Sequence, residues 1–209
     1  MNFSADPAAS PARTRKGESR RERILQSAAR VLAEHGYSGS TLNDIAERAG
    51  TKSGSLYHYF DSREDLIREV MTRGITETID HVTGAVEELP AEATSRDRLA
   101  AAVTAHVRYL LTENDIARAS IRTLRQAPPE VQGPAIELHR EYGHYLGTLI
   151  DAAMADGYLD RSVDSRVLRL LIVGAANWST AWYRLGGPAS VDEIADVAAR
   201  MALGEIGGR

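Results

Sequence analysis

The sequence predicts an all-α protein, and three observations favour that fold class. Apolar residues recur at helical spacing along most of the chain after residue 17, and no strand-like alternation of apolar and polar residues is sustained. Glycine and proline separate the periodic segments. The chain has 209 residues, 43% of them hydrophobic and 26% charged, so it is long enough to bury a core of its own.

The N-terminal part predicts a tail followed by a helix. Residues 1–17 are rich in alanine, proline, serine and basic residues without periodicity, which indicates a disordered basic tail. Ser19 with Glu22 three residues later has the pattern of a capping box, so a helix is expected to begin there. Gly36 is expected to end it.

Three further capping patterns predict the starts of later helices. They are Thr41 with Asp44, Asp61 with Glu64, and Ser190 with Glu193. The second helix is expected to end at Gly50, a short segment around 53–59 follows it, and the long helix after Glu64 is expected to close at Pro90.

The second half of the chain predicts five more helices without a sequence repeat. They lie near 96–112, 115–126, 130–156, 164–185 and 191–204. About nine helices are therefore expected in all. We divide the chain into a disordered basic tail (1–17), a three-helix domain (18–63) and a larger helical domain (64–209).

The net charge of −4 conceals an asymmetry along the chain. Residues 1–63 carry ten Lys and Arg against seven Asp and Glu, whereas residues 64–209 carry fifteen against twenty-two. A basic end on an acidic body indicates a polyanion-binding segment, although a solvated basic tail gives the same distribution of charged residues.

The absence of cysteine excludes disulfides, thiolate metal sites and cysteine nucleophiles. No apolar run near the N-terminus has the form of a signal peptide. The longest apolar stretch, residues 170–176, is too short to span a bilayer. A cytoplasmic protein without a membrane partner is expected.

Residues 41–66 have the organisation of a helix-turn-helix. A short helix, a glycine turn and a second short helix suit DNA, because the first helix braces the backbone while the second enters the major groove. Small residues at 53–55 allow close approach, and polar residues from 52 to 58 can donate and accept hydrogen bonds. Leu56 and Phe60, four residues apart, are expected to hold the second helix to the core.

This segment resembles the DNA-binding signature of the TetR family of bacterial transcriptional regulators. The motif reads Thr41-Leu-x-Asp-Ile-Ala-x-x-Ala-Gly50, then Gly54-x-Leu-Tyr-x-x-Phe60, then Glu64-x-Leu66, and the resemblance extends over about residues 20–70. Two positions depart from the family pattern. Tyr59 stands where the family usually has histidine, and Arg63 stands where it usually has lysine.

The resemblance implies a division of roles on the DNA. Base-edge contacts are expected from Lys52, Ser53, Gly54, Ser55 and His58, and phosphate contacts from Thr41, Tyr57, Tyr59 and Arg63. The basic tail, through Arg13, Arg15, Lys16 and Arg20, is expected to act as an arm along the minor groove or the backbone. Two alternatives stay open: Tyr59 as a packed core aromatic, and a tail that is only solvated.

The C-terminal helices have the apolar faces of a dimer interface. The segment 167–185 is apolar nearly all round, and 191–202 is apolar on one face, so two such helices from each subunit would form a four-helix bundle. The candidate interface residues are Val167, Leu171, Ala175, Val191, Ile194, Ala198 and Met201. Packing within the monomer core is the alternative. A two-fold homodimer predicts a palindromic operator.

The resemblance also implies that residues 18–63 form the helix-turn-helix DNA-binding domain and that residues 64–209 form a ligand-binding and dimerisation domain. A small-molecule effector is expected to bind among the middle helices of the second domain. The candidate pocket residues are Val107, Leu110, Leu111, Leu124, Tyr142, Tyr145, Leu146, Leu149, Asn177, Trp178 and Trp182, although such apolar stripes also occur in ordinary cores. Residues 177–188 are similar to a stretch in family members that regulate lipid and steroid breakdown, some of which sense acyl-coenzyme A. They indicate a bulky apolar acid or its coenzyme A thioester.

We therefore expect a homodimeric repressor that binds operator double-stranded DNA and is released by a small, apolar ligand. An activator of the same fold, or a helical enzyme or interaction protein without operator binding, is the alternative. Against an enzyme, the sequence has no phosphate-binding glycine loop, no His-based metal motif and no nucleophile elbow. No catalytic residue, metal site or cofactor is expected.

Overall fold

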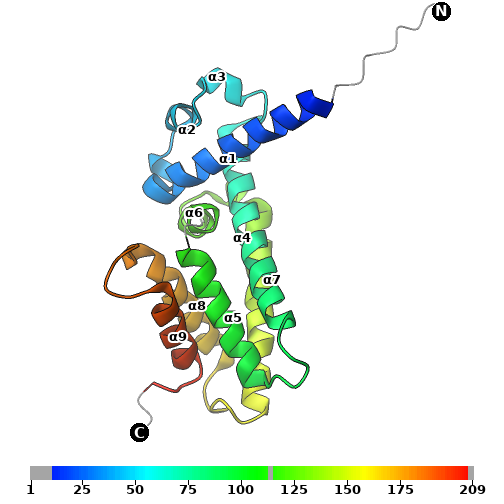
Figure 1. Cartoon of the computed structure of the whole chain (residues 1–209), viewed down its shortest axis with the longest axis vertical. Helices are drawn as coiled ribbons and strands as arrows, with labels where there is room; N and C mark the ends of the chain where they lie inside the picture. The colour runs from blue at the N-terminus through cyan, green and yellow to red at the C-terminus, as the bar shows by residue number, and fades with distance from the viewer. Residues whose placement is uncertain (1–10, 113–114, 207–209) are drawn as a thin grey trace, which may run out of the picture.

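Nine helices and no strand form the part of the chain that the structure, a computed structural model, describes: residues 11–112 and 115–206, with side chains from residue 17 (Figure 1). The helices are α1 (Pro11–Gly39), α2 (Leu42–Arg48), α3 (Ser53–Leu56), α4 (Arg63–Glu87), α5 (Ser95–Leu111), α6 (Asp115–Leu124), α7 (Pro129–Ala155), α8 (Ser165–Trp182) and α9 (Val191–Ala202). The predicted all-α class is confirmed.

The first helix differs from the prediction at both ends. α1 begins at Pro11, so residues 11–17 are helical rather than part of a disordered tail, and Ser19 lies inside the helix instead of capping it. Proline suits the first turn of a helix, and the arginines, lysine and glutamate that follow are good helix formers. Gly36, with φ 71° and ψ −173°, breaks the helical path, but helical residues continue to Gly39. Residues 1–10 of the predicted tail lie outside the described residues.

The predicted caps are partly confirmed. The capping boxes of Thr41 with Asp44 and of Ser190 with Glu193 form as predicted. The cap predicted at Asp61 with Glu64 is wrong by one residue. The Ser62 hydroxyl accepts from the Asp65 N–H at 3.0 Å, so Ser62 is the N-cap of α4. α8 ends at Trp182, three residues before the predicted end, because Tyr183 has extended backbone angles.

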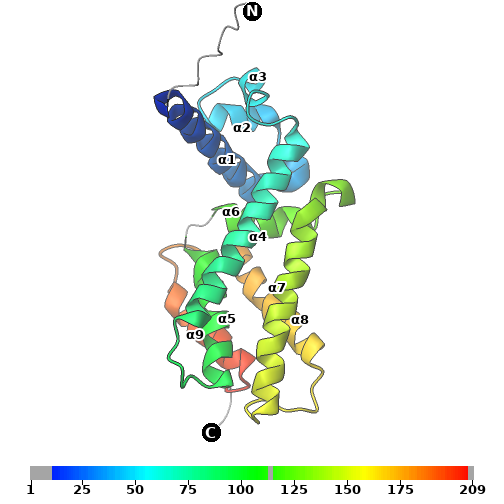
Figure 2. The same cartoon turned by 90° about the vertical axis from the view of Figure 1, so that its right-hand side faces the viewer.

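The short helices α2 and α3 lie at one end of the molecule, where α1 crosses them (Figure 1). α4 runs from this end into the body and packs there against α5, α6 and α7, while α8 and α9 lie beyond α5 (Figures 1 and 2). One buried cluster joins both ends, since it contains Leu32 of α1, Leu56 of α3, Leu66 of α4, Ile116 of α6 and Leu146 of α7. The predicted boundary at residue 63 therefore does not separate two hydrophobic cores.

No helix within residues 11–112 and 115–206 is long and apolar enough to cross a membrane.

Candidate DNA interface and effector site

A glycine turn sets the angle between α2 and α3. Gly50 has φ 64°, a left-handed conformation that glycine adopts without steric cost. The N–H of Gly50 donates to the Glu47 carbonyl, and the N–H of Thr51 donates to the Ala46 carbonyl, so the last carbonyls of α2 are satisfied. The chain is then free to begin α3 at Ser53, whose hydroxyl donates to Oδ1 of Asn43 on α2.

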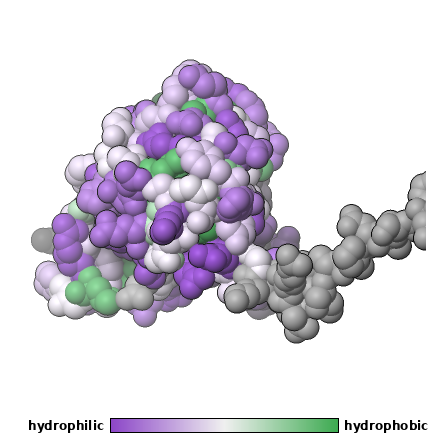
Figure 3. All heavy atoms as spheres, turned by 90° about the horizontal axis from the view of Figure 1, so that it is seen from above, coloured by the Kyte–Doolittle hydropathy of each residue, from purple (hydrophilic) through white to green (hydrophobic). Residues whose placement is uncertain are grey.

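One side of the α3 segment is buried and the other is exposed. Leu56 and Phe60 are 1% and 4% exposed and fix the segment to the core, as predicted. Tyr57 is 57% exposed, and the predicted base-edge residues Lys52, Gly54 and His58 are exposed beside it, with Ser53 and Ser55 half-buried. Figure 3 looks onto this end of the molecule, and the surface there is mostly hydrophilic. The α3 surface thus has the polar groups and the small residues that a major groove requires.

The predicted phosphate contacts occupy different environments. Thr41 uses its hydroxyl in the cap of α2, donating to Oδ2 of Asp44 at 2.7 Å, and Tyr59 is half-buried against the core. The Arg63 guanidinium donates to the carbonyls of Tyr37 and Ser40 and lies over the Tyr37 ring. In this structure Arg63 therefore closes the C-terminal end of α1.

Two arginines of α1, Arg20 and Arg21, contact the helix-turn-helix and the start of α4. Arg20 donates to the Thr51 hydroxyl at 3.2 Å, which places it on the turn between α2 and α3. Arg21 pairs with Glu69 and lies over the Phe60 ring. The other predicted arm residues, Arg13, Arg15 and Lys16, have side chains outside the described part of the chain.

A small polar cavity lies at the centre of the body. It has a volume of about 20 Å³ and is lined from five helices by Gly74, Ile75, Thr78, His106, Ala117, Ser120, Ile121, His139, Tyr142, Val173 and Asn177. The Tyr142 hydroxyl donates to Nδ1 of His106 at 2.7 Å, and Nε2 of His106 donates to Oδ1 of Asn177 at 3.1 Å. Nε2 of His139 is buried without a partner among the described residues. The cavity thus combines a satisfied polar chain with one buried polar atom that a ligand can engage.

Burial keeps both histidines of this cavity neutral. Loss of hydration lowers the pKa of His106 to about 4, with the hydrogen bond to Asn177 acting weakly in the opposite direction. Loss of hydration likewise lowers the pKa of His139 to about 4. Desolvation also raises the pKa of Tyr142, so its hydroxyl stays protonated as the donor to His106.

The buried His106 should make folding sensitive to acid. Its pKa in the folded chain lies below the value of about 6.5 expected when unfolded, so the unfolded chain binds the proton more tightly. Its contribution is therefore complete above pH 6.5 and lost as the pH falls toward 4, by about 3 kcal/mol of unfolding free energy. Urea unfolding at pH 7 and pH 4 should show a smaller loss in His106→Gln than in the parent chain.

The matched control for this measurement is Thr104→Ala on the same helix α5, which changes no titratable group. Thr104→Ala should lose as much unfolding free energy between pH 7 and pH 4 as the parent does. An equally steep loss in His106→Gln would show that His106 is not buried in its neutral form.

The structure brings together only part of the predicted effector pocket. Tyr142 and Asn177 line the cavity, but Leu110, Leu111, Leu124, Tyr145, Leu146 and Leu149 pack into cores and do not line it. Thr78 and Ser120 also line it and were not predicted, although a polar residue on the buried face of an apolar helix is the signal that reveals such positions.

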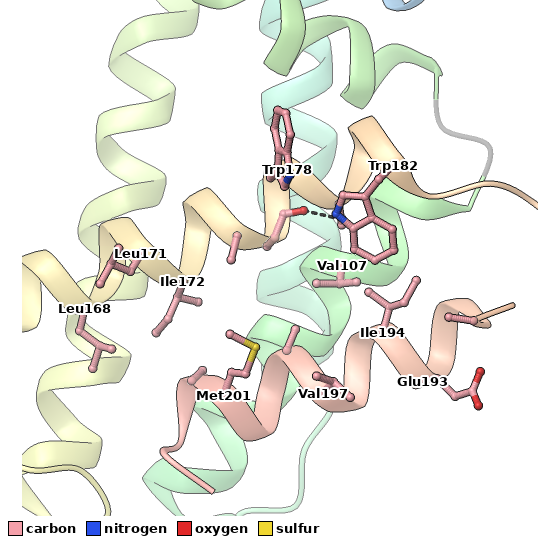
Figure 4. A pocket seen from close by; sticks show the side chains of 16 residues that line it. Val107, Leu168, Leu171, Ile172, Trp178, Trp182, Glu193, Ile194, Val197 and Met201 are labelled. Carbon is pink, nitrogen blue, oxygen red and sulfur yellow. Dashed lines mark hydrogen bonds between the residues drawn. The ribbon is translucent and has the colours of Figure 1, made fainter. Parts of the chain in front are cut away.

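Val107, Trp178 and Trp182 line a different site, an open groove between α8 and α9 of about 470 Å³ (Figure 4). Their helix positions face this groove and not the central cavity, so their contact with an effector stays a prediction. Of the predicted interface residues, Val167, Leu171, Ala175 and Met201 are exposed along the same surface. Val191, Ile194 and Ala198 are half-buried and also contact the core below it.

These features define a helix-turn-helix protein with a helical second domain. Residues 24–70 match the model of bacterial regulatory proteins of the tetR family, and residues 92–206 match that of the tetracyclin repressor-like C-terminal domain. The chain is 31% identical over 188 residues to the HTH-type transcriptional repressor KstR2 of Rhodococcus jostii, covering 88% of this chain and 90% of that protein. The chain belongs to the TetR family of bacterial transcriptional regulators.

Two further proteins are informative for comparison. The fatty acid metabolism regulator protein of Bacillus subtilis is 26% identical over 160 residues, covering 76% of this chain and 81% of that protein. The crystal structure of AibR in complex with isovaleryl coenzyme A and operator DNA superposes with a TM-score of 0.75 at 25% identity, over 87% of this chain and 97% of that one.

Proposed function

We propose that this protein is a cytoplasmic, non-enzymatic repressor that binds a palindromic operator as a homodimer and is released by a small molecule. The exposed polar surface of α3, fixed from below by Leu56 and Phe60, carries the proposal. It is the arrangement in which a second helix of a helix-turn-helix enters the major groove. The relatives named as repressors, and the relative that binds operator DNA, support the same assignment.

The exposed groove between α8 and α9 supports the homodimer. Leu171 is 66% exposed, Trp178 69% and Met201 55%, and together they form a contiguous apolar surface of the kind that marks an interface. Two half-sites of one operator require a two-fold pairing that presents both α3 helices on one face of the dimer.

The central cavity supports an effector site that opens on binding. Pockets for ligands of drug size have volumes of roughly 300 Å³ or more, so a cavity of about 20 Å³ must expand to admit one. We propose a coenzyme A thioester or a related bulky apolar acid as the effector, since a relative binds isovaleryl coenzyme A. Its polar carbonyl or carboxyl end would bond the free Nε2 of His139.

Helix α6 connects this cavity to the DNA-binding end. Ser120 and Ile121 line the cavity, while Arg122 from the same helix donates to the Ala33 carbonyl of α1 at 2.8 Å. The Tyr37 N–H of α1 donates to Oε1 of Gln126, just after α6, also at 2.8 Å. An effector that displaces α6 therefore displaces α1, and it favours dimers whose α3 spacing no longer matches the operator.

Substitutions on α3 should separate sequence preference from general affinity. His58→Ala and Lys52→Ala should change the sequence profile selected from a random DNA pool, because base-edge contacts carry specificity. Tyr57→Ala should weaken binding to all sequences by a similar factor without changing that profile. Tyr158→Ala, which removes an exposed tyrosine from the α7–α8 connection, should change neither property. If all four variants selected the same DNA sequence profile as the parent chain, this division of roles would be refuted.

A further inference from the structure

A polar groove between α7 and α8 lies outside the sites described so far. It has a volume of about 240 Å³ and is lined by Gly143, His144, Gly147, Thr148, Asp151, Ser165, Arg166 and Arg169. Figure 2 shows the two helices of this groove joined by the loop at the bottom of the body. Its two arginines, one histidine and one aspartate give the lining an excess of positive charge.

The arginines of this groove are not neutralised by the protein. Within the described residues, neither Arg166 nor Arg169 forms an ion pair, with Asp151 or with any other carboxylate, whereas half of the described arginines after residue 63 do. The N–H groups of Arg166 and Val167 at the start of α8 are already bound by the Asp164 carboxylate. An anion in the groove would therefore be held by the guanidinium groups.

Two glycines of α7 make room for one of these guanidinium groups. A Cβ atom at Gly143 would lie 2.2 Å from Nη1 of Arg169, and one at Gly147 would lie 3.8 Å from its Cδ. The Arg169 side chain thus lies directly on the backbone of α7, half-buried, with its guanidinium beside the groove. A guanidinium without a carboxylate partner can donate in two parallel hydrogen bonds to phosphate oxygens.

The groove and the central cavity share no lining residue, but neighbouring positions of α7 and α8 line the two sites. Tyr142, which lines the cavity, directly precedes Gly143, and Val173 lies one helical turn after Arg169. From Arg166 to Asn177 the distance along α8 is about 16 Å, at a rise of 1.5 Å per residue. A ligand that occupies both sites must be elongated, with an anionic end at the arginines and an acyl end at His139 and Asn177.

We propose that the α7–α8 groove binds the phosphate groups of a coenzyme A thioester whose acyl end enters the central cavity. This inference rests on the proposed effector class, and it assigns the parts of that ligand to two neighbouring sites. Arg166 and Arg169 donate to the phosphate oxygens, and the hydroxyls of Thr148 and Ser165 are additional donors in the same groove.

Calorimetric titration of the full-length protein without DNA tests this proposal, with coenzyme A, pantetheine and inorganic phosphate as probes. Coenzyme A should bind the parent chain, and the Arg166→Gln/Arg169→Gln double variant should bind it at least tenfold more weakly. Pantetheine, which has no phosphate, should bind both chains equally weakly. Arg140→Gln, which removes an exposed arginine of α7 paired with Glu137, is the control and should bind like the parent.

Gly143→Ala distinguishes a binding role of Arg169 from a structural one. The added Cβ displaces the guanidinium but keeps its charge, and alanine in place of glycine within a helix favours folding. We expect this variant to bind coenzyme A several-fold more weakly while unfolding at an equal or higher temperature. A purely structural Arg169 would leave coenzyme A affinity unchanged.

Three results would overturn the proposal: no coenzyme A binding to the parent chain, equal affinity in the double variant, or phosphate alone binding as tightly as coenzyme A. The last would assign the groove to free phosphate. Operator binding of the ligand-free double variant should equal that of the parent. A parent chain that binds no operator would refute the proposed function, whereas the calorimetric result would still decide the anion site.

Discussion

We expect the Leu171→Glu chain to sediment as a monomer and to bind operator DNA at least 100-fold more weakly than the parent. Leu171 is 66% exposed at the centre of the apolar surface of α8, so a polar residue there leaves the core of the monomer intact. In the proposed dimer the same substitution buries a carboxylate from each subunit without a partner, at a cost of several kcal/mol. A monomer reads only one half-site and loses the contribution of the second.

The control is Val163→Glu, in the connection before α8. Val163 is 43% exposed and also apolar, but it does not line the groove between α8 and α9. This variant should remain dimeric and bind operator like the parent. If Leu171→Glu instead sediments as a dimer at micromolar concentration, the α8–α9 surface is not the dimer interface.

The caps of α2 and α9 were predictable because their hydrogen bonds join residues that are close in sequence. Thr41 with Asp44 and Ser190 with Glu193 form capping boxes from residues three apart, so no tertiary contact is needed to identify them. The start of α1 was not predictable, because the composition of residues 11–17 suits both a solvated tail and a helix. From residue 20 onward tertiary contacts stabilise this helix, since Arg20 donates to Thr51 and Arg21 pairs with Glu69 and lies over the Phe60 ring.

Site residues in the second half of the chain depend on helix rotation, which periodicity determines poorly. Asn177 and Trp178 are neighbours in sequence, but consecutive residues are about 100° apart around a helix. Asn177 lines the central cavity, whereas Trp178 lines the outer groove. Between residues 170 and 176 α8 has no polar side chain, so the sequence alone offers no polar side from which to orient this part of the helix. The helix-turn-helix had such a side, and its exposed residues were predicted.

The surface of α3 contains a position that tests DNA contact without disturbing the fold. Gly54 is exposed, its φ lies outside the left-handed region, and a Cβ atom built on it meets no heavy atom within 4 Å. The protein alone therefore gives no steric reason for glycine here. Close approach of α3 to the floor of a major groove explains the glycine at position 54, because a side chain at this point would separate α3 from the bases.

Gly54→Leu should consequently fold as the parent does and lose operator affinity by at least 100-fold, toward the level of non-specific binding. Leucine is also a better helix former than glycine, so the melting temperature should not fall. The control is Gly84→Leu on α4, where a Cβ atom likewise meets nothing within 4 Å and the site lies far from α3. Fluorescence anisotropy with operator DNA at fixed salt should show full affinity for Gly84→Leu. Full affinity for Gly54→Leu as well would mean that α3 does not enter the groove, since a protruding leucine can be accommodated only where no DNA lies.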